Sequence, residues 1–278
     1  MSDRIDYNSW IHDLIAPVYE TRHAEIFNET EQRRIRAELS AAIGHIRSAS
    51  GVPRVLDFGA GTGNLTRHLL ELGCAAVASD VSAGSLRELK RSVPGSARLE
   101  LSLLNGRDLA RFPEASFDLA GVYSVLHHVP DYLAVIDEFV RVVKPGGVIY
   151  IDHEVCPAYW EELPEYRQYT LEVAQRQALE TEGPWCRLGG MLRRKGWWRF
   201  LAAALYLRLN RVADDGDIHT FPDDHIEWGE IRSRLEPHCE LLVEEDYLVC
   251  REKAVPPPVW RAWRGRCTDM RLVVARKR

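Results

Sequence analysis

The sequence predicts an α/β fold built on a parallel sheet, and two observations carry this prediction. From residue 52 onward, apolar stretches typical of β-strands alternate with amphipathic helix patterns, as in parallel sheets with helices on both faces. The first stretch runs directly into a glycine-rich turn, Gly59-Ala60-Gly61-Thr62-Gly63, ahead of a helix pattern. Such sheets bind ligands where their strands end, so we expect the functional site there.

Seven strands follow from this pattern. One helix is expected at 131–143, with Ile136 and Val140 on its apolar face, and Lys144-Pro145-Gly146-Gly147 should break it. Upstream, Asn28 with Glu31 three residues later is typical of a helix N-cap. The strands are expected at 54–58, 75–79, 98–104, 117–123, 148–151, 241–250 and 270–275.

The chain divides into four regions. Residues 1–50 are expected to form an N-terminal helical lid, and residues 51–156 a cofactor-binding core. The strand–helix alternation then stops, so residues 157–235 are expected to form a mainly helical cap over the substrate. The last two strands of the sheet should lie in residues 236–278.

The composition argues against several classes of protein. The chain has 278 residues and a formal net charge of −5, whereas nucleic-acid-binding domains are usually basic, so we expect no DNA or RNA partner. The N-terminus lacks the apolar segment of a secretory signal, and no window is apolar enough to cross a membrane. Six scattered cysteines without a Cys-x-x-Cys pair favour reduced thiols in a cytoplasmic protein. The sequence is compatible with a homodimer.

The glycine spacing distinguishes between cofactors. A dinucleotide fingerprint reads Gly-x-Gly-x-x-Gly, whereas this turn reads Gly-x-Gly-x-Gly with Asp57 two places ahead, which disfavours an NAD-dependent oxidoreductase. The stretch resembles motif I of the class I S-adenosylmethionine (SAM) methyltransferases. Further blocks resemble their type 11, ubiquinone-biosynthesis-like branch: Phe117-Asp118-Leu119, Val125-Leu126-His127-His128-Val129 and Val142-Val143-Lys144-Pro145-Gly146-Gly147. This resemblance implies a Rossmann-like sheet in the order 3-2-1-4-5-7-6, with the seventh strand antiparallel, and SAM as cofactor.

The cofactor residues are predicted partly by position and partly by that resemblance. Asp80 ends the second strand, where an acid can accept both ribose hydroxyls, and Val81 can pack on the adenine. After the third strand we chose Asn105 over Asp108 as the partner of the adenine amino group. The resemblance adds Tyr19 from the lid. The predicted set is Tyr19, Asp57, Gly59, Ala60, Gly61, Gly63, Asn64, Asp80, Val81, Asn105, Gly106 and Tyr123.

Three histidines are candidates for a catalytic base. His128 follows the fourth strand at the predicted mouth of the site, where a purely structural role is an equal alternative. His219 and His225 lie near Asp223 and Asp224 in the cap, an arrangement suited to a base with an orienting acid or to a divalent metal. Their spacing matches no metal motif, so no metal is predicted, and Asp223 could instead be a helix N-cap.

These observations predict a SAM-dependent methyltransferase that acts on a hydroxyl of a small molecule such as a natural product, sugar or phenol. N- or C-methylation is the alternative, and a SAM-binding regulatory or assembly protein is the alternative of another class. Residues 185–211 carry basic side chains interleaved with aromatic ones and no acid. That segment could bind a lipid-like or carrier-bound anionic acceptor or lie on a membrane surface, although a cap helix with a solvated basic edge is the preferred interpretation.

Overall fold

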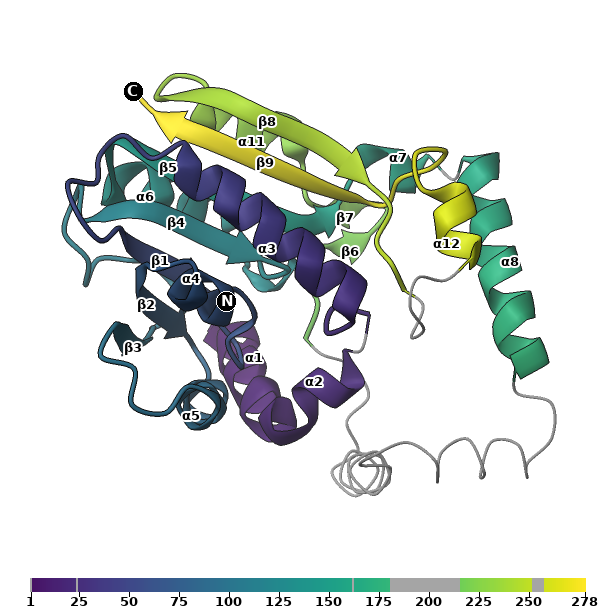
Figure 1. Cartoon of the computed structure of the whole chain (residues 1–278), viewed down its shortest axis with the longest axis horizontal. Coiled ribbons are helices and arrows are strands. Elements are labelled where there is room, and N and C mark those ends of the chain that lie inside the picture. Colours follow the sequence, from purple (N-terminus) through teal and green to yellow (C-terminus); the bar gives the residue numbers. More distant parts are fainter. Residues whose placement is uncertain (1, 24, 162, 181–215, 252–257) are drawn as a thin grey trace.

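The computed structural model describes residues 2–23, 25–161, 163–180, 216–251 and 258–278. Its main sheet has the strand order β3-β2-β1-β4-β5-β9-β8, and β9 runs antiparallel to both of its neighbours while the other pairs are parallel (Figure 1). Since β8 and β9 are the sixth and seventh strands of this sheet, the predicted order is confirmed. The strands are β1 Arg54–Phe58, β2 Ala75–Asp80, β3 Leu99–Leu103, β4 Phe117–Tyr123, β5 Val143–Val155, β8 Cys239–Tyr247 and β9 Met270–Lys277.

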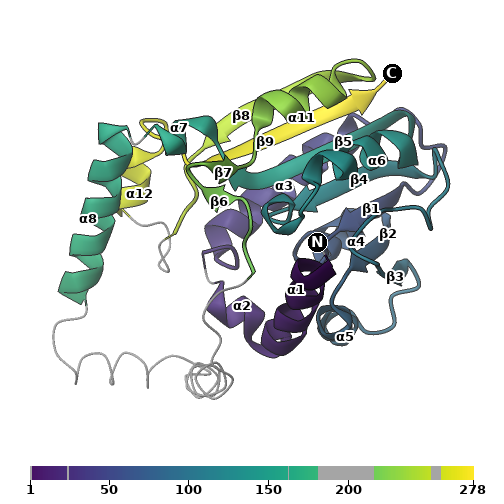
Figure 2. The same ribbon diagram turned by 180° about the vertical axis from the view of Figure 1, so that it is seen from behind.

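Helices cover both faces of the sheet. In Figure 1, α3 and α4 lie in front of the sheet, and α6 and α11 lie behind it, as the reverse view in Figure 2 shows. The N-terminal helices α1 and α2 lie below the ends of the central strands. The helices are α1 Ser2–Ile15, α2 Tyr19–Arg22, α3 Glu29–Gly44, α4 Asn64–Glu71, α5 Ala83–Ser92, α6 Tyr132–Val142, α7 Pro157–Trp160, α8 Pro164–Glu180, α11 Trp228–Leu235 and α12 Pro258–Trp263, with 3-10 turns η1 Ala16–Val18 and η2 Leu126–His128.

Polar caps start the helices that flank the site. The Asn28 side chain accepts a hydrogen bond from the Glu31 backbone N–H at 3.0 Å, so the predicted N-cap of α3 is confirmed. Ser82 caps α5 in the same way, and Asp131 caps α6. A side-chain oxygen in each case satisfies an N–H that the first helical turn leaves free.

The core forms two layers, one on each face of the sheet. Every residue of β4 is buried, as expected for a central strand covered on both faces. On one face Leu56 and Ile149 pack with α6 and α11; on the other, Val55 and Tyr150 pack with α3 and α4. Because α3 and α11 supply side chains to these layers, both helices belong to the sandwich around the sheet, although α3 lies in the predicted lid and α11 in the predicted cap.

β5 differs from its expected form at both ends. Lys144-Pro145-Gly146-Gly147 ends α6, as predicted, but these residues already belong to β5, which begins at Val143. Near its other end, Asp152 pairs with Leu272 and Glu154 with Arg271, so His153 is an extra residue on this strand. His153 has a φ of +64°, a left-handed conformation that is uncommon for residues other than glycine. This β-bulge lies at the sheet edge where the site is expected.

The described part of the cap lies beyond the end of β5. α8 and α12 pack side by side there around buried Tyr169 and Trp263 (Figures 1 and 2). A small hairpin, β6 Thr220–Phe221 with β7 Asp224–His225, precedes α11. Asp223 lies in the turn of this hairpin, and Glu227 occupies the N-cap position of α11, so the helix-cap alternative for Asp223 is wrong. The basic aromatic segment at 185–211 lies outside the described residues.

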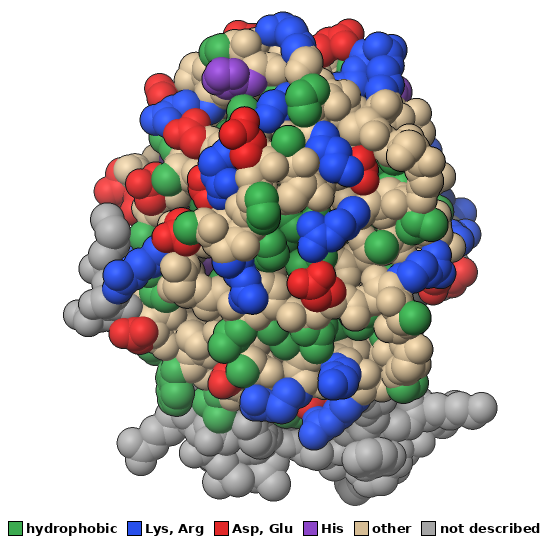
Figure 3. Space-filling model, turned by 90° about the vertical axis from the view of Figure 1, so that its left-hand side faces the viewer, with side chains coloured by type: hydrophobic (Ala, Val, Ile, Leu, Met, Phe, Trp, Pro, Cys, Tyr) green, Lys and Arg blue, Asp and Glu red, His purple; other side chains and the backbone are tan. Residues whose placement is uncertain are grey.

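Two further observations concern the surface. None of the helices in the described ranges is long and apolar enough to cross a bilayer. On the face drawn in Figure 3, acidic and basic side chains are interspersed among the described residues.

Candidate functional site

A pocket of about 880 Å³ lies where the carboxyl ends of β1, β2 and β4 meet. Its wall includes the glycine loop after β1, the end of β2 and the loop after β3. Residues of α1 line it as well. The position is the one at which a doubly wound sheet binds a nucleotide-like ligand. We call it the cofactor pocket.

The glycine loop takes a conformation that its glycines make possible. Gly59, Gly61 and Gly63 all have φ between +52° and +101°. A Cβ on Gly59 would come within 2.5 Å of the Val125 side chain, so this position needs glycine for packing as well as for its backbone angle. A Cβ on Gly61 would meet nothing within 4 Å, because this residue lines the open pocket. The loop therefore offers its bare backbone to a ligand.

Asp80 is the acid of the pocket. Its two carboxylate oxygens accept hydrogen bonds from the backbone N–H groups of Gly61, at 2.8 Å, and Ser82, at 2.7 Å. A carboxylate offers about four acceptor positions, so two remain for a ribose diol. Burial raises the pKa of Asp80 to about 6. Val81 lines the pocket beside it, as expected for a residue that packs on adenine.

Asp57 lies behind the loop. Its side chain is buried and accepts a hydrogen bond from the Thr66 hydroxyl at the start of α4. Burial raises the pKa of Asp57 to about 7. Asp57 is absent from the residues that line the described pockets, so its contacts are those of a residue that holds the loop against α4.

The loop after β3 orients its polar residues differently from the prediction. Asn105 accepts hydrogen bonds from the backbone N–H groups of Arg107 and Asp108 and does not line the cofactor pocket. Gly106 and Asp108 do line it. A Cβ on Gly106 would come within 2.5 Å of Ile5 in α1, so the lid and this loop touch directly. The geometry thus favours Asp108, the alternative that the sequence analysis ranked second.

Tyr19 lines the cofactor pocket, whereas Tyr123 lines a smaller hollow beside it. Tyr19 from α2 also lines this hollow of about 330 Å³, whose wall includes Ala60, Asn64 and Tyr123. The Tyr123 ring stacks on His153, with centroids 4.7 Å apart. The predicted residues Tyr19, Ala60, Asn64 and Tyr123 thus come together around one end of the glycine loop.

A second hollow of about 810 Å³ adjoins the cofactor pocket, and both are lined by His12, Tyr19, Ser124 and His128. Acidic and basic groups line it too, among them Glu154, Asp217 and Arg251. We call it the histidine chamber, because its wall contains His12, His23, His127, His128, His153 and His219.

Glu154 connects several parts of the wall of this chamber through hydrogen bonds. It is buried, and its carboxylate accepts hydrogen bonds from the backbone N–H groups of Val125 and Leu126 and lies 2.8 Å from His127 Nδ1. Burial lowers the pKa of His127, but the Glu154 carboxylate more than offsets this and raises it above its usual value. Glu154 was not predicted from the sequence, and of the neighbouring pair His127 and His128 only His128 was chosen as a candidate base. An acid and a histidine at the ends of neighbouring strands were the available signal.

Neutral rings form the boundary between the two hollows. Burial, with His23 and His127 nearby, lowers the pKa of His12 to about 4. Burial and the neighbouring His127 lower the pKa of His128 well below its usual value. His12 and His128 meet edge to face, with centroids 5.1 Å apart. Both rings are therefore uncharged at neutral pH and can accept a proton or a hydrogen bond.

The two cap histidines occupy different places. His219 lines the chamber, but its Nδ1 faces Asp224 and its Nε2 lies 3.1 Å from the Val129 carbonyl, so both nitrogens already have an acceptor. His225 is absent from the lining of the described pockets and packs on Trp160, with its Nε2 3.4 Å from Glu227. Of the three predicted bases, His128 alone borders both hollows.

Comparison with known proteins agrees with this geometry. Residues 56–151 match the family of methyltransferase domains. The chain is 38% identical over 98 residues to a demethylmenaquinone methyltransferase of Clavibacter sepedonicus, a match that covers 35% of this chain and 40% of the relative. It is 32% identical over 99 residues to a ubiquinone biosynthesis O-methyltransferase of Xanthomonas campestris, covering 35% of this chain and 41% of that protein. The matches span about two fifths of these relatives.

A solved structure supports the fold over nearly the whole chain. An S-adenosylmethionine dependent methyltransferase of Mesorhizobium loti superposes with a TM-score of 0.53 at 19% identity, covering 87% of this chain and 98% of that one. The sheet and its glycine loop define a Rossmann-like cofactor-binding domain. Residues 56–151 carry the methyltransferase domain, and these matches support a class I SAM-dependent methyltransferase with SAM as the methyl donor.

Proposed function

We propose that this chain transfers the methyl group of SAM to a hydroxyl of a small-molecule acceptor bound in the histidine chamber. The observation that carries the proposal is the shared wall of the two hollows, formed by His12, Tyr19, Ser124 and His128. A methyltransferase needs such an arrangement, because donor and acceptor must meet in line while water is excluded.

The fit of the cofactor pocket to SAM rests on its own residues. Gly61 leaves open space where another residue would place a Cβ, and Asp80 keeps two acceptor positions for a ribose. SAM supplies an electrophilic methyl group: a lone pair of the acceptor oxygen forms the new O–CH₃ bond, sulfur keeps the electrons of the broken C–S bond, and the hydroxyl proton is released. The uncharged His12 and His128 rings line the boundary without repelling a sulfonium cation.

A hydroxyl is the acceptor that suits this chamber best. Oxygen needs to lose its proton during the transfer, and imidazole and carboxylate groups line the chamber in which the acceptor would lie. The Xanthomonas relative, whose name specifies O-methylation, supports the same choice. Phenols and quinols are the first acceptors to test, because the names of the two relatives refer to demethylmenaquinone and to ubiquinone biosynthesis.

The test uses methyl-labelled SAM with panels of phenols, quinols, aliphatic alcohols and amines. We expect label in an O-methyl product, identified by mass and NMR, and tight binding of S-adenosylhomocysteine but not of NAD by calorimetry. His238→Gln is a control that should leave methyl transfer unchanged, because His238 is exposed in the turn before β8. Label on nitrogen or carbon would contradict the proposed atom. Tight S-adenosylhomocysteine binding without transfer to any acceptor would favour a binding protein without turnover.

A further inference from the structure

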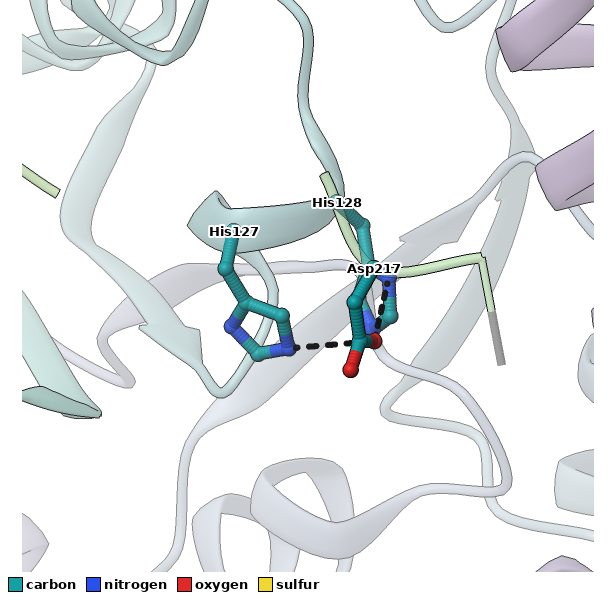
Figure 4. Close-up of side chains that lie close together, drawn as sticks. All are labelled: His127, His128 and Asp217. Carbon is teal, nitrogen blue, oxygen red and sulfur yellow. Dashed lines mark ion pairs between the residues drawn. The ribbon is translucent and has the colours of Figure 1, made fainter. Parts of the chain in front are cut away.

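We propose that His127, His128 and Asp217 bind a divalent transition-metal ion at the mouth of the histidine chamber, and that this ion holds the acceptor hydroxyl. The second half of the inference rests on the proposed function; the metal site itself does not. No metal was predicted from the sequence, because the spacing of His219 and His225 with their neighbouring acids matches no metal motif. Asp217 lies far from the His127–His128 pair along the chain, and only the fold brings them together (Figure 4).

The three side chains converge on one point. Asp217 Oδ1 lies 3.4 Å from His128 Nδ1 and 3.9 Å from His127 Nε2, and all three donor atoms lie within 4.8 Å of one another. Neighbouring ligands in a tetrahedral shell with bonds of about 2.1 Å lie about 3.4 Å apart. The His128–Asp217 edge already has this length. Asp217 is 44% exposed, so its side chain can rotate to shorten the His127–Asp217 edge.

The backbone fixes this juxtaposition. The N–H groups of Ile218 and His219 both donate to the His127 carbonyl, at 2.9 and 3.0 Å. On the other side, the Asn8 amide of α1 donates to the His128 carbonyl at 2.9 Å. Asp217 therefore belongs to a segment anchored directly on the histidine pair, and its approach to both rings does not depend on its side chain alone.

Both imidazoles have a nitrogen available for a ligand. The buried Glu154 carboxylate at His127 Nδ1 holds the proton there, which turns the Nε2 lone pair toward Asp217. A carboxylate behind the distal nitrogen is the usual second shell of a metal-bound histidine. His128 Nδ1 is buried and makes no hydrogen bond within the described ranges. An orphaned buried nitrogen beside a carboxylate oxygen is an arrangement that a metal ion would satisfy.

The ligand set indicates the class of metal. Two imidazoles and one carboxylate suit Zn²⁺, Fe²⁺, Co²⁺ or Ni²⁺ and are a poor match for Mg²⁺ or Ca²⁺, which prefer oxygen ligands. Three protein ligands leave coordination positions open toward the chamber, where a hydroxyl can bind and lose its proton more readily. The nearby carboxylates of Glu154 and Asp217 offset the charge of a divalent ion next to the sulfonium site.

The test titrates Co²⁺ alone into the chelator-treated full chain, without SAM or acceptor. We expect one Co²⁺ per chain by calorimetry, with visible d–d absorption that reports imidazole ligation. Asp217→Asn should weaken binding at least about tenfold. Asp223→Asn is the matched control, an exposed carboxylate in the nearby hairpin turn, and should bind Co²⁺ like the parent chain.

Glu154→Gln tests the orienting carboxylate. A glutamine oxygen can still accept from the Val125 and Leu126 N–H groups, but an amide N–H toward His127 Nδ1 favours the opposite tautomer and removes the Nε2 lone pair. Co²⁺ binding should weaken about 10- to 100-fold, while the chain still folds and keeps its S-adenosylhomocysteine affinity.

The outcomes separate the two proposals. Equal Co²⁺ affinity in Asp217→Asn and the parent chain would overturn the metal site. Full methyl transfer by protein shown to be metal-free would overturn the role of the ion in holding the acceptor hydroxyl. Stoichiometric Co²⁺ binding that depends on Asp217 supports the site, even when no acceptor is methylated, an outcome that would count against the proposed function alone.

Discussion

The affinity for S-adenosylhomocysteine should fall when the solution is acidified through pH 6, because Asp80 must be ionised to accept two ribose hydroxyls. Its pKa of about 6 lies above its usual value, so the charged form is present at pH 7.5 and is lost as the pH falls through 6. At pH 5, one unit below that pKa, only about one Asp80 in eleven is ionised. If the protonated form contributes little to binding, the dissociation constant should rise about tenfold between pH 7.5 and pH 5.

Calorimetric titrations at pH 7.5, 6 and 5 measure this change. Asp80→Asn is the matched variant: it should bind at least about tenfold more weakly at pH 7.5, because it loses a charged acceptor, and its affinity should not depend on pH over this range. Asp57→Asn separates the neighbouring acid, whose pKa is about 7, and should keep the pH dependence. An affinity of the parent chain that stays constant from pH 7.5 to 5, with the fold intact, would refute this role for Asp80.

Two substitutions test how the glycine loop is held. Gly59→Ala should lower the free energy of unfolding by about 1–3 kcal/mol, because its Cβ would meet Val125, whereas Gly44→Ala at the end of α3, with nothing within 4 Å, should be neutral or raise it by up to about 1 kcal/mol. Urea denaturation compares them, and equal effects would contradict the packing argument. Thr66→Val should cost about 1–3 kcal/mol in the same assay, because it leaves the buried Asp57 carboxylate without its hydroxyl donor; a change below about 0.5 kcal/mol would count against that bond.

Local patterns in the sequence were enough to place the strands and the glycine loop, whereas the strand order followed from the family resemblance. The apolar runs predicted β1 and β4 residue for residue, and the Gly-x-Gly-x-Gly spacing located the loop that lines the pocket. The N-cap at Asn28 was predictable for the same reason, because a cap depends on residues three positions apart. These features are short-range, so neighbouring residues specify them.

The chamber required contacts that no local pattern contains. Glu154 of β5 contacts His127 of η2, the turn that follows the neighbouring strand β4, and Asp217 approaches both histidines from a distant segment. Asn105 and Asp108 both bond within their own loop, and only the backbone geometry of the loop decides that Asp108 lines the pocket. The cap prediction at 185–211 lies outside the described residues.

The extra residue at His153 also affects how this chain is compared with others. In an uninterrupted strand, Asp152 and Glu154 would share one face, but here Asp152 meets Arg34 of α3 while Glu154 bonds to η2. An alignment that runs through β5 without a gap would therefore equate Glu154 with residues facing the opposite layer in any protein that lacks the bulge. Residues after Asp152 are best compared with residues of other proteins that border the same hollow. A functional role transferred by alignment position alone would be assigned to the wrong side chain.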